Sequence, residues 1–169
     1  VVDRSGEVRV IPALLALIER LARTHEVHVF ALHQEAAPGR WELAGASIHN
    51  IGSGWTRWRA IAAIRAEHRR APFDVVQAIF SGSCSLVGVA AARLLRLPSL
   101  VHVAGGELVA LHAIDYGGRR KWKGRLREAC VLRAADVVTA ASAPIIDALP
   151  APGLEAQRVP LGVDLHAWP

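Results

Sequence analysis

The sequence has little cysteine and no cluster of residues that would hold a metal ion. Cys84 and Cys130 are its two cysteines, and they form no Cys-x-x-Cys pair. Both lie in apolar or helical surroundings, so we expect buried, reduced thiols and not a disulfide or a metal pair. The eight histidines are scattered, and the closely spaced His25 and His28 lie at an expected strand start. We therefore expect no metal site.

Long apolar runs are missing as well. Hydrophobic residues make up 52% of the 169 residues, which is enough for a core and excludes a disordered chain. These residues come in short blocks, and no block approaches the length of a membrane-spanning helix, which is about 20 residues. The first apolar segment carries charges at Glu7, Arg9 and Glu19, which does not fit a signal peptide. We expect one cytoplasmic domain over residues 1–169.

Several catalytic motifs are also lacking. The segment Ser81-Gly-Ser-Cys84 does not fit the Gly-x-Ser-x-Gly nucleophile elbow. There is no Walker loop, no complete Gly-x-Gly-x-x-Gly and no evident nucleophile–base–acid set. Hydrolase and dehydrogenase functions are therefore disfavoured, and the catalytic residues stay unknown.

Positive charge is in excess, with a net charge of +5. A basic balance fits nucleic acid, anionic lipid or phosphorylated small molecules as partners. It also fits a GC-rich genome that favours arginine. Charge alone therefore does not decide the function.

The hydrophobic pattern alternates between strands and helices. Helical spacing runs over residues 8–23, with Pro12 in the first turn, where its missing N–H costs nothing. This alternation predicts βαβ units, and so a parallel sheet flanked by helices on both faces with right-handed crossovers. Further helices are expected at residues 55–70, 85–96 and 118–133, and after Ser142. Strands are expected at residues 26–32, 46–51, 73–79, 99–104, 136–140 and 157–161. A Pro/Gly loop is expected at residues 37–40.

The first strand of such a fold is expected to be truncated. Doubly wound folds normally begin with a buried strand whose βα turn carries glycine. Here Val1 and Val2 are followed almost at once by Gly6 and a helical pattern. Either the two valines are what remains of that strand or the natural protein extends further, and we expect the second.

Three predicted strands end in small or acidic residues, the last of them at Gly162 and Asp164, a pattern typical of buried parallel strands that face a ligand. Gly105 and Gly106 would let the backbone approach a ligand closely, and Glu107 could accept hydrogen bonds from sugar hydroxyls. The alternative is a turn with a solvated glutamate. Ser142 ends the strand expected at residues 136–140, and it could simply cap the helix that follows.

Gly6 precedes the first helix and has two interpretations. It could belong to a glycine loop that meets a diphosphate at the helix N-terminus. In the alternative, Ser5 is an ordinary N-cap and Gly6 and Glu7 lie in the first turn.

Two segments combine tryptophan with basic residues. The first, residues 119–127, opens a helix with cations that oppose its dipole. Anionic lipid headgroups or a phosphorylated acceptor would explain it, and the alternative is a solvated basic face. In the second, Trp55 and Trp58 alternate with arginines, and we expect an amphipathic helix that covers the core. The contact residues expected in the first segment are Arg119, Arg120, Lys121 and Trp122.

Two strings in the last third resemble the N-terminal domain of family 4 glycosyltransferases. They are Leu132-Arg-Ala-Ala-Asp-Val-Val-Thr-Ala-Ala-Ser142 and Arg158-Val-Pro-Leu-Gly-Val-Asp-Leu-His-Ala-Trp-Pro169. In that family an R-A-D-x-V-x-x-x-S strand and helix precede a V-I-P-N-G-V-D-x-x-x-F segment. The resemblance implies a GT-B fold, in which two Rossmann-like domains face a cleft. Residues 1–169 would form the N-terminal, acceptor-side half, without the C-terminal donor-binding domain.

The resemblance also implies roles for particular residues. The family uses a nucleotide-sugar as donor, retains the anomeric configuration and needs no metal or other cofactor. Gly6 and Ser142 would lie on the donor side of the cleft. The acceptor side would be lined by Gly105, Gly106 and Glu107. The family often has His-Gly-x-Asp at this strand end, and this chain has Ala104 where the histidine usually stands.

We therefore expect the acceptor-binding domain of a hexosyltransferase of carbohydrate biosynthesis, inactive alone because transfer needs donor and acceptor held together. Its partners would be a nucleotide-sugar, a sugar or lipid acceptor and an anionic surface at the inner face of the membrane. Nucleic acid is not expected. Two alternatives stay open: half of a GT-B-fold nucleotide-sugar epimerase, and a noncatalytic basic module that binds anionic lipid or nucleic acid.

Overall fold

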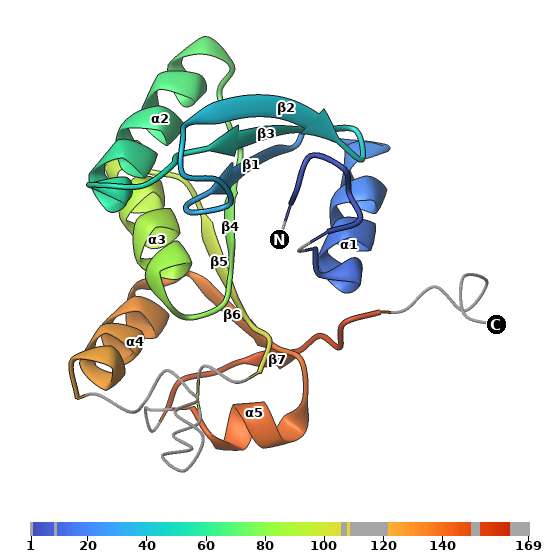
Figure 1. The fold of residues 1–169 in the computed structure, drawn as a ribbon. Helices are drawn as coiled ribbons and strands as arrows, with labels where there is room; N and C mark the ends of the chain where they lie inside the picture. Colours follow the sequence, from blue (N-terminus) through green and yellow to red (C-terminus); the bar gives the residue numbers. More distant parts are fainter. Residues whose placement is uncertain (1, 9, 106–107, 109–121, 150–152, 163–169) are drawn as a thin grey trace, which may run out of the picture. The chain divides into compact units, whose positions relative to one another are not determined.

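The computed structural model describes residues 2–8, 10–105, 108, 122–149 and 153–162. The chain divides into two compact units (Figure 1). The first unit comprises residues 1–64 and 162–169, and the second comprises residues 65–161. Among the described residues, no helix combines the length and the apolar character needed to cross a membrane.

The first unit is built on a three-stranded sheet in the order β1-β3-β2. The strands are β1 (His28–Ala31), β2 (Gly39–Leu43) and β3 (Ala46–Asn50). Strand β1 is parallel to β3, and β2 is antiparallel to it. Helix α1 (Pro12–Ala22) contributes Ile18 to a core around Val2 and Ile48. The helix begins four residues after the periodic pattern does, because Pro12 is suited to a first turn.

Strand β2 was not predicted, and its first two residues fall in the expected loop at 37–40. It pairs with β3 in a register that places Gly39 opposite Asn50 and Leu43 opposite Ala46. The hairpin turn uses Ala44 and Gly45, with φ of 52° and 78°, as turns that match the strand twist require. Every second residue of β2 is exposed, so its sequence lacks the continuous apolar run of a strand that is buried on both faces.

The second unit confirms the predicted parallel α/β fold. Its four-stranded sheet has the order β4-β5-β6-β7, and every pair is parallel. The core gathers between the sheet and its flanking helices around Val101, Val103 and Leu132, all with 0% exposure. The strands are β4 (Val76–Ile79), β5 (Ser99–Val103), β6 (Val137–Ala140) and β7 (Gln157–Arg158), and the helices are α3 (Ser83–Leu95), α4 (Trp122–Ala134) and α5 (Ala143–Asp147).

Helix α2 (Thr56–Arg70) crosses the boundary between the two units. Its bounds agree with the predicted helix at 55–70. The cysteines differ from expectation, because Cys84 and Cys130 are free but exposed, not buried. The first lies in the opening turn of α3 and the second on α4, and in each case the apolar helix neighbours, not the cysteine, face the core.

Candidate functional site

The first candidate site is the carboxyl edge of the four-stranded sheet, where β5 and β6 end (Figure 1). These strands are parallel neighbours, and Val103 pairs with Ala140. The Ala141 N–H donates to the Val103 carbonyl at 3.0 Å, which continues the ladder. Gly105 and Ser142 each lie two residues beyond the last pair, so two predicted site residues meet at one edge. The other predicted residues of this edge lie outside the described residues: Gly106 and Glu107.

Two glycines lie along this edge without close neighbours among the described residues. Gly82 follows β4 and Gly105 follows β5. A β-carbon built at either position would meet no described heavy atom within 4 Å. At Gly88 the same β-carbon would lie 3.1 Å from that of Ala78, so there close packing of the helix on the sheet favours glycine. No contact among the described residues demands glycine at the edge, where a ligand can approach the backbone closely.

Buried polar groups fix the strand ends behind the edge. His102 Nδ1 and Thr139 Oγ1 lie 2.8 Å apart across β5 and β6, and both residues are 4% exposed. The Phe80 N–H donates to the His102 carbonyl at 2.9 Å. The Ser85 hydroxyl donates to the Phe80 carbonyl. These bonds join the ends of β4, β5 and β6, so the residues beyond them start from well-defined positions.

Ser142 stands at the N-cap of α5, as the alternative interpretation predicted, but its side chain does not cap the helix. Its backbone is extended, with φ of −152° and ψ of 161°, and the hydroxyl makes no capping hydrogen bond. Its carbonyl accepts from the N–H groups of Ile145 and Ile146, each at 3.2 Å. The hydroxyl is therefore not committed to the helix N-terminus.

An ionic clamp joins the same two strands at their amino ends. Asp136 Oδ2 accepts from the Ser99 N–H at 2.9 Å and from the Ser99 hydroxyl at 2.7 Å. Arg93 lies 3.2 Å from Asp136 Oδ1 and also donates to the Ala134 carbonyl. The Ser99 bonds, assisted by the Arg93 charge, lower the pKa of Asp136 below its usual value. The clamp sets the β5–β6 register that brings Gly105 beside Ser142.

Gly6, the predicted donor-side glycine, lies in a closed turn that begins at Asp3. Helix α1 has Ile11 as its N-cap, so the interpretation of Ser5 as a cap of this helix is wrong. The Ser5 hydroxyl instead donates to Asp3 Oδ1 at 2.8 Å. Gly6 has φ of 73°, and its N–H donates to the Asp3 carbonyl at 3.0 Å. Because this turn ends well before Pro12, Gly6 is not part of the helix N-terminus.

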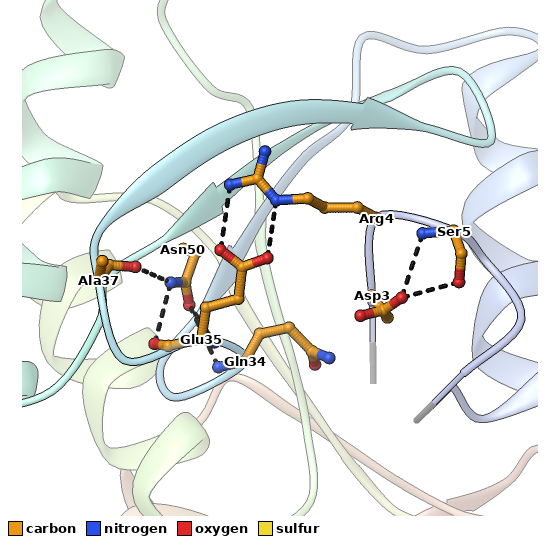
Figure 2. Close-up of polar contacts among 7 residues, drawn as sticks. All are labelled: Asp3, Arg4, Ser5, Gln34, Glu35, Ala37 and Asn50. Carbon is orange, nitrogen blue, oxygen red and sulfur yellow. Dashed lines mark hydrogen bonds and ion pairs between the residues drawn. The ribbon is translucent and has the colours of Figure 1, made fainter.

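A polar network that the sequence did not reveal holds this turn on the sheet (Figure 2). Arg4 binds Glu35 through two nitrogens, at 2.7 and 3.0 Å, and its guanidinium lies 4.6 Å from the Trp41 ring centre. Asn50, which is 3% exposed, accepts from the Gln34 and Glu35 N–H groups at 3.1 and 3.3 Å. Its amide donates back to the Glu35 carbonyl at 3.1 Å. One buried amide thus shapes the loop that follows β1.

Two histidines form a second unpredicted feature of the first unit. His28 Nδ1 lies 2.9 Å from His49 Nε2, and His28 Nε2 lies 3.0 Å from Glu26 Oε1. His49 is 5% exposed and stacks on Phe30 with ring centres 4.6 Å apart. It also lines a hollow of about 360 Å³ together with Arg40. Within the described ranges, no three His, Cys, Asp or Glu side chains could hold a metal ion.

The helix that was expected to cover the core with its tryptophans exposes them instead. Trp55 is 83% exposed and Trp58 is 70% exposed, so the prediction that they cover the core is wrong. The buried side of α2 is formed by smaller residues such as Ala60 and Ile64. Trp122 is 62% exposed, with the Lys123 ammonium 5.7 Å from its ring centre. The remaining residues of the predicted contact segment lie outside the described residues: Arg119, Arg120 and Lys121.

Comparison with known proteins agrees with the geometry. Residues 10–162 match the model of the glycosyl transferase 4-like domain family. A solved chain of sucrose-phosphate synthase from Thermosynechococcus elongatus superposes with a TM-score of 0.61 at 14% identity, covering 89% of this chain and 83% of that one. At this identity the likeness shows the fold alone, a GT-B-like Rossmann fold. No curated protein matches the sequence. Because the family model spans nearly the whole chain, the protein belongs to the glycosyl transferase 4-like domain family.

Proposed function

We propose that this chain is the acceptor-side domain of a glycosyltransferase that moves a hexosyl group from a nucleotide-sugar to an acceptor. The observation that carries the proposal is the edge where Gly105 and Ser142 meet, in a chain of this family. Ligands of open α/β sheets bind beyond the carboxyl ends of the strands. Open space over Gly82 and Gly105 supports ligand binding there.

Each residue of the edge has a distinct proposed role. Gly105 and Gly106 would allow the acceptor to approach the backbone, and the Glu107 carboxylate would accept hydrogen bonds from its hydroxyls. Ser142, whose hydroxyl is not used for capping, would donate to the donor side of the cleft. Gly6 would lie near the donor phosphates, a role that the family resemblance implies. As the family resemblance implies, transfer would use no metal and no resident cofactor, and the nucleoside diphosphate would leave as the new glycosidic bond forms.

The isolated chain is expected to bind acceptor without transferring sugar. Transfer requires the anomeric carbon of the donor and the acceptor hydroxyl to be held in contact, and the donor would bind mainly to a second domain. The basic residues Arg119, Arg120 and Lys121, with Trp122, would contact a phosphorylated acceptor or lipid headgroups. Substituting these three cations by alanine should weaken that contact.

Backbone NMR of the chain titrated with a panel of monosaccharides, sugar phosphates and nucleotide-sugars tests this proposal. We expect an acceptor-class sugar to shift the amide signals of Gly105 and Ser142. Replacing Glu107 by Gln should weaken that binding about tenfold, the cost of losing a charged hydrogen-bond acceptor. The matched control is Glu155→Gln, a change at an exposed glutamate of the same unit.

Two results would contradict the proposal. One is a panel in which no sugar shifts the edge amides. The other is release of nucleoside diphosphate by the chain alone when it is given a nucleotide-sugar and an acceptor.

A further inference from the structure

Two large apolar side chains stand on the surface at the start of α2. Trp55 immediately precedes the helix and Trp58 lies in its first turn, with exposures of 83% and 70%. Tryptophan is usually largely buried, because its ring offers more apolar area than most side chains. Two exposed tryptophans three residues apart therefore contribute little to the core.

The backbone at Trp55 is unfavourable as well. Its φ of 47° lies in the left-handed region, which residues with a β-carbon seldom adopt. Gly54, with φ of 72°, precedes it, so the chain turns sharply just before the helix. The turn directs the Trp55 ring to solvent, where neither burial nor backbone preference favours it. An unfavourable residue that the fold does not need points to a contact outside the chain.

The exposed side of α2 carries charge of one sign. Its only acidic residue, Glu67, is 2% exposed and is paired with Arg70 at 3.1 Å. At helical spacing Trp58, Ala62 and Arg65 follow one another along the exposed side. The exposed residues of the helix are five arginines, two alanines and one tryptophan: Arg57, Trp58, Arg59, Ala62, Arg65, Ala66, Arg69 and Arg70.

We propose that this surface, which we name the α2 face and which consists of Trp55, Trp58, Arg59, Ala62, Arg65 and Arg69, docks onto an anionic lipid bilayer. The tryptophan rings would enter the region between headgroups and acyl chains, where aromatic rings with one polar group are favoured. The arginines would bind lipid phosphates, which their planar guanidinium groups match in shape. The helix needs no new backbone partners within its length, because helical N–H and carbonyl groups pair with one another.

A bilayer fits this face better than a nucleic acid does. Single-stranded nucleic acid binds in grooves where aromatic rings alternate with cations along the strand. Here Arg57 and Arg59 flank Trp58 at the start of α2, and Arg65 and Arg69 follow along the same helix, so the face lies on the convex surface of a helix and not in a groove that follows a strand. A convex helix surface with rings and cations suits the flat surface of a bilayer, where an apolar layer lies below a charged one. The docking is a property of α2 and does not depend on sugar transfer.

Vesicle flotation of the whole chain tests the proposal. We expect the chain to float with vesicles of phosphatidylcholine containing phosphatidylglycerol, and not with vesicles of phosphatidylcholine alone. The double variant Trp55→Gly/Trp58→Ala should lower the partition coefficient about tenfold or more, because the buried aromatic area is lost. Arg65→Ala should lower it about fivefold, the contribution of one cation near an anionic surface.

Controls separate docking from folding and from general stickiness. Leu94→Ala removes another exposed apolar side chain, 56% exposed on α3, and should leave flotation unchanged. Thermal unfolding should show the double variant folded, because neither ring contributes to the core. Full flotation of that double variant would overturn the proposal. So would binding to single-stranded DNA, or to an acidic peptide, without binding to the anionic vesicles.

Discussion

Trp55 combines a left-handed backbone, with φ of 47°, with an exposed side chain. A left-handed backbone costs an L-residue about 1–2 kcal/mol, and glycine avoids this cost. Glycine also loses about 0.4–1 kcal/mol more chain entropy on folding. Because the Trp55 ring is 83% exposed, little burial is lost with it. We expect Trp55→Gly to raise the free energy of unfolding by about 0.5–1 kcal/mol, measured by urea denaturation.

Trp58 supplies the matched control for this prediction. It is also exposed, but it lies inside α2, where glycine lowers helix stability by about 0.5–1 kcal/mol. The two glycine variants should therefore change stability in opposite directions. Equal destabilisation by both would mean that the left-handed backbone at Trp55 carries no cost.

Single residues also show where sequence reasoning stops. Gly105 and Ser142 could be found because each ends an apolar run, and the parallel register then brings them together. Asn50 and Glu35 gave no comparable signal. Their partners lie 13 to 31 positions away in loops, where no periodicity exists. A buried asparagine is recognisable only once the backbone groups around it are placed.

At the scale of elements, strand prediction succeeded where both faces are buried. The strands β5 and β6 read as short apolar runs, since helices cover the sheet. Strand β2 was missed because it is a half-exposed edge strand of the first sheet, begun by Gly39. Its identity depends on the Ala44-Gly45 turn, in which alanine adopts an unusual left-handed conformation. Such a turn carries a weaker sequence signal than Asn-Gly would.

The clamp between β5 and β6 should make stability depend on pH. The pKa of Asp136 is lower in the folded chain than its ordinary value of 3.8, mainly through the Ser99 bonds. Ionised Asp136 therefore stabilises the fold above pH 3.8, and this contribution is lost as the pH falls through the lower folded value. Asp136→Asn should lower the free energy of unfolding at neutral pH. The gap in free energy of unfolding between this variant and the parent should shrink as the pH falls.

Urea denaturation at a series of pH values measures this effect, with Glu155→Gln as the control at an exposed carboxylate. The free energies of unfolding of Asp136→Asn and of the parent could instead differ by the same amount at neutral and at acid pH. That result would show that the carboxylate charge plays no part in the clamp.

At the scale of the whole molecule, the order of elements follows from hydrophobic periodicity, but their grouping does not. Periodicity is a local property, and the two units arise from contacts between distant segments. One hydrophobic cluster surrounds Ile48 and another surrounds Leu132. The resemblance to the family was recognised in short strings near the end of the chain, which carry more specific information than the α/β pattern around them. The match of the family model over residues 10–162 then showed membership.

The two clusters predict separate responses to core truncation. Ile48 is 1% exposed and Leu132 is 0% exposed, so replacing either by Ala should cost about 2–5 kcal/mol. Because each side chain packs within its own unit, Ile48→Ala should speed amide hydrogen exchange in β1 and β3 first, and Leu132→Ala in β5 and β6. Hydrogen exchange with mass spectrometry of both variants measures this pattern. If either substitution accelerates exchange equally in both sheets, the chain unfolds as one cooperative unit, and a mutation far from the Gly105–Ser142 edge would disturb that edge as strongly as one beneath it.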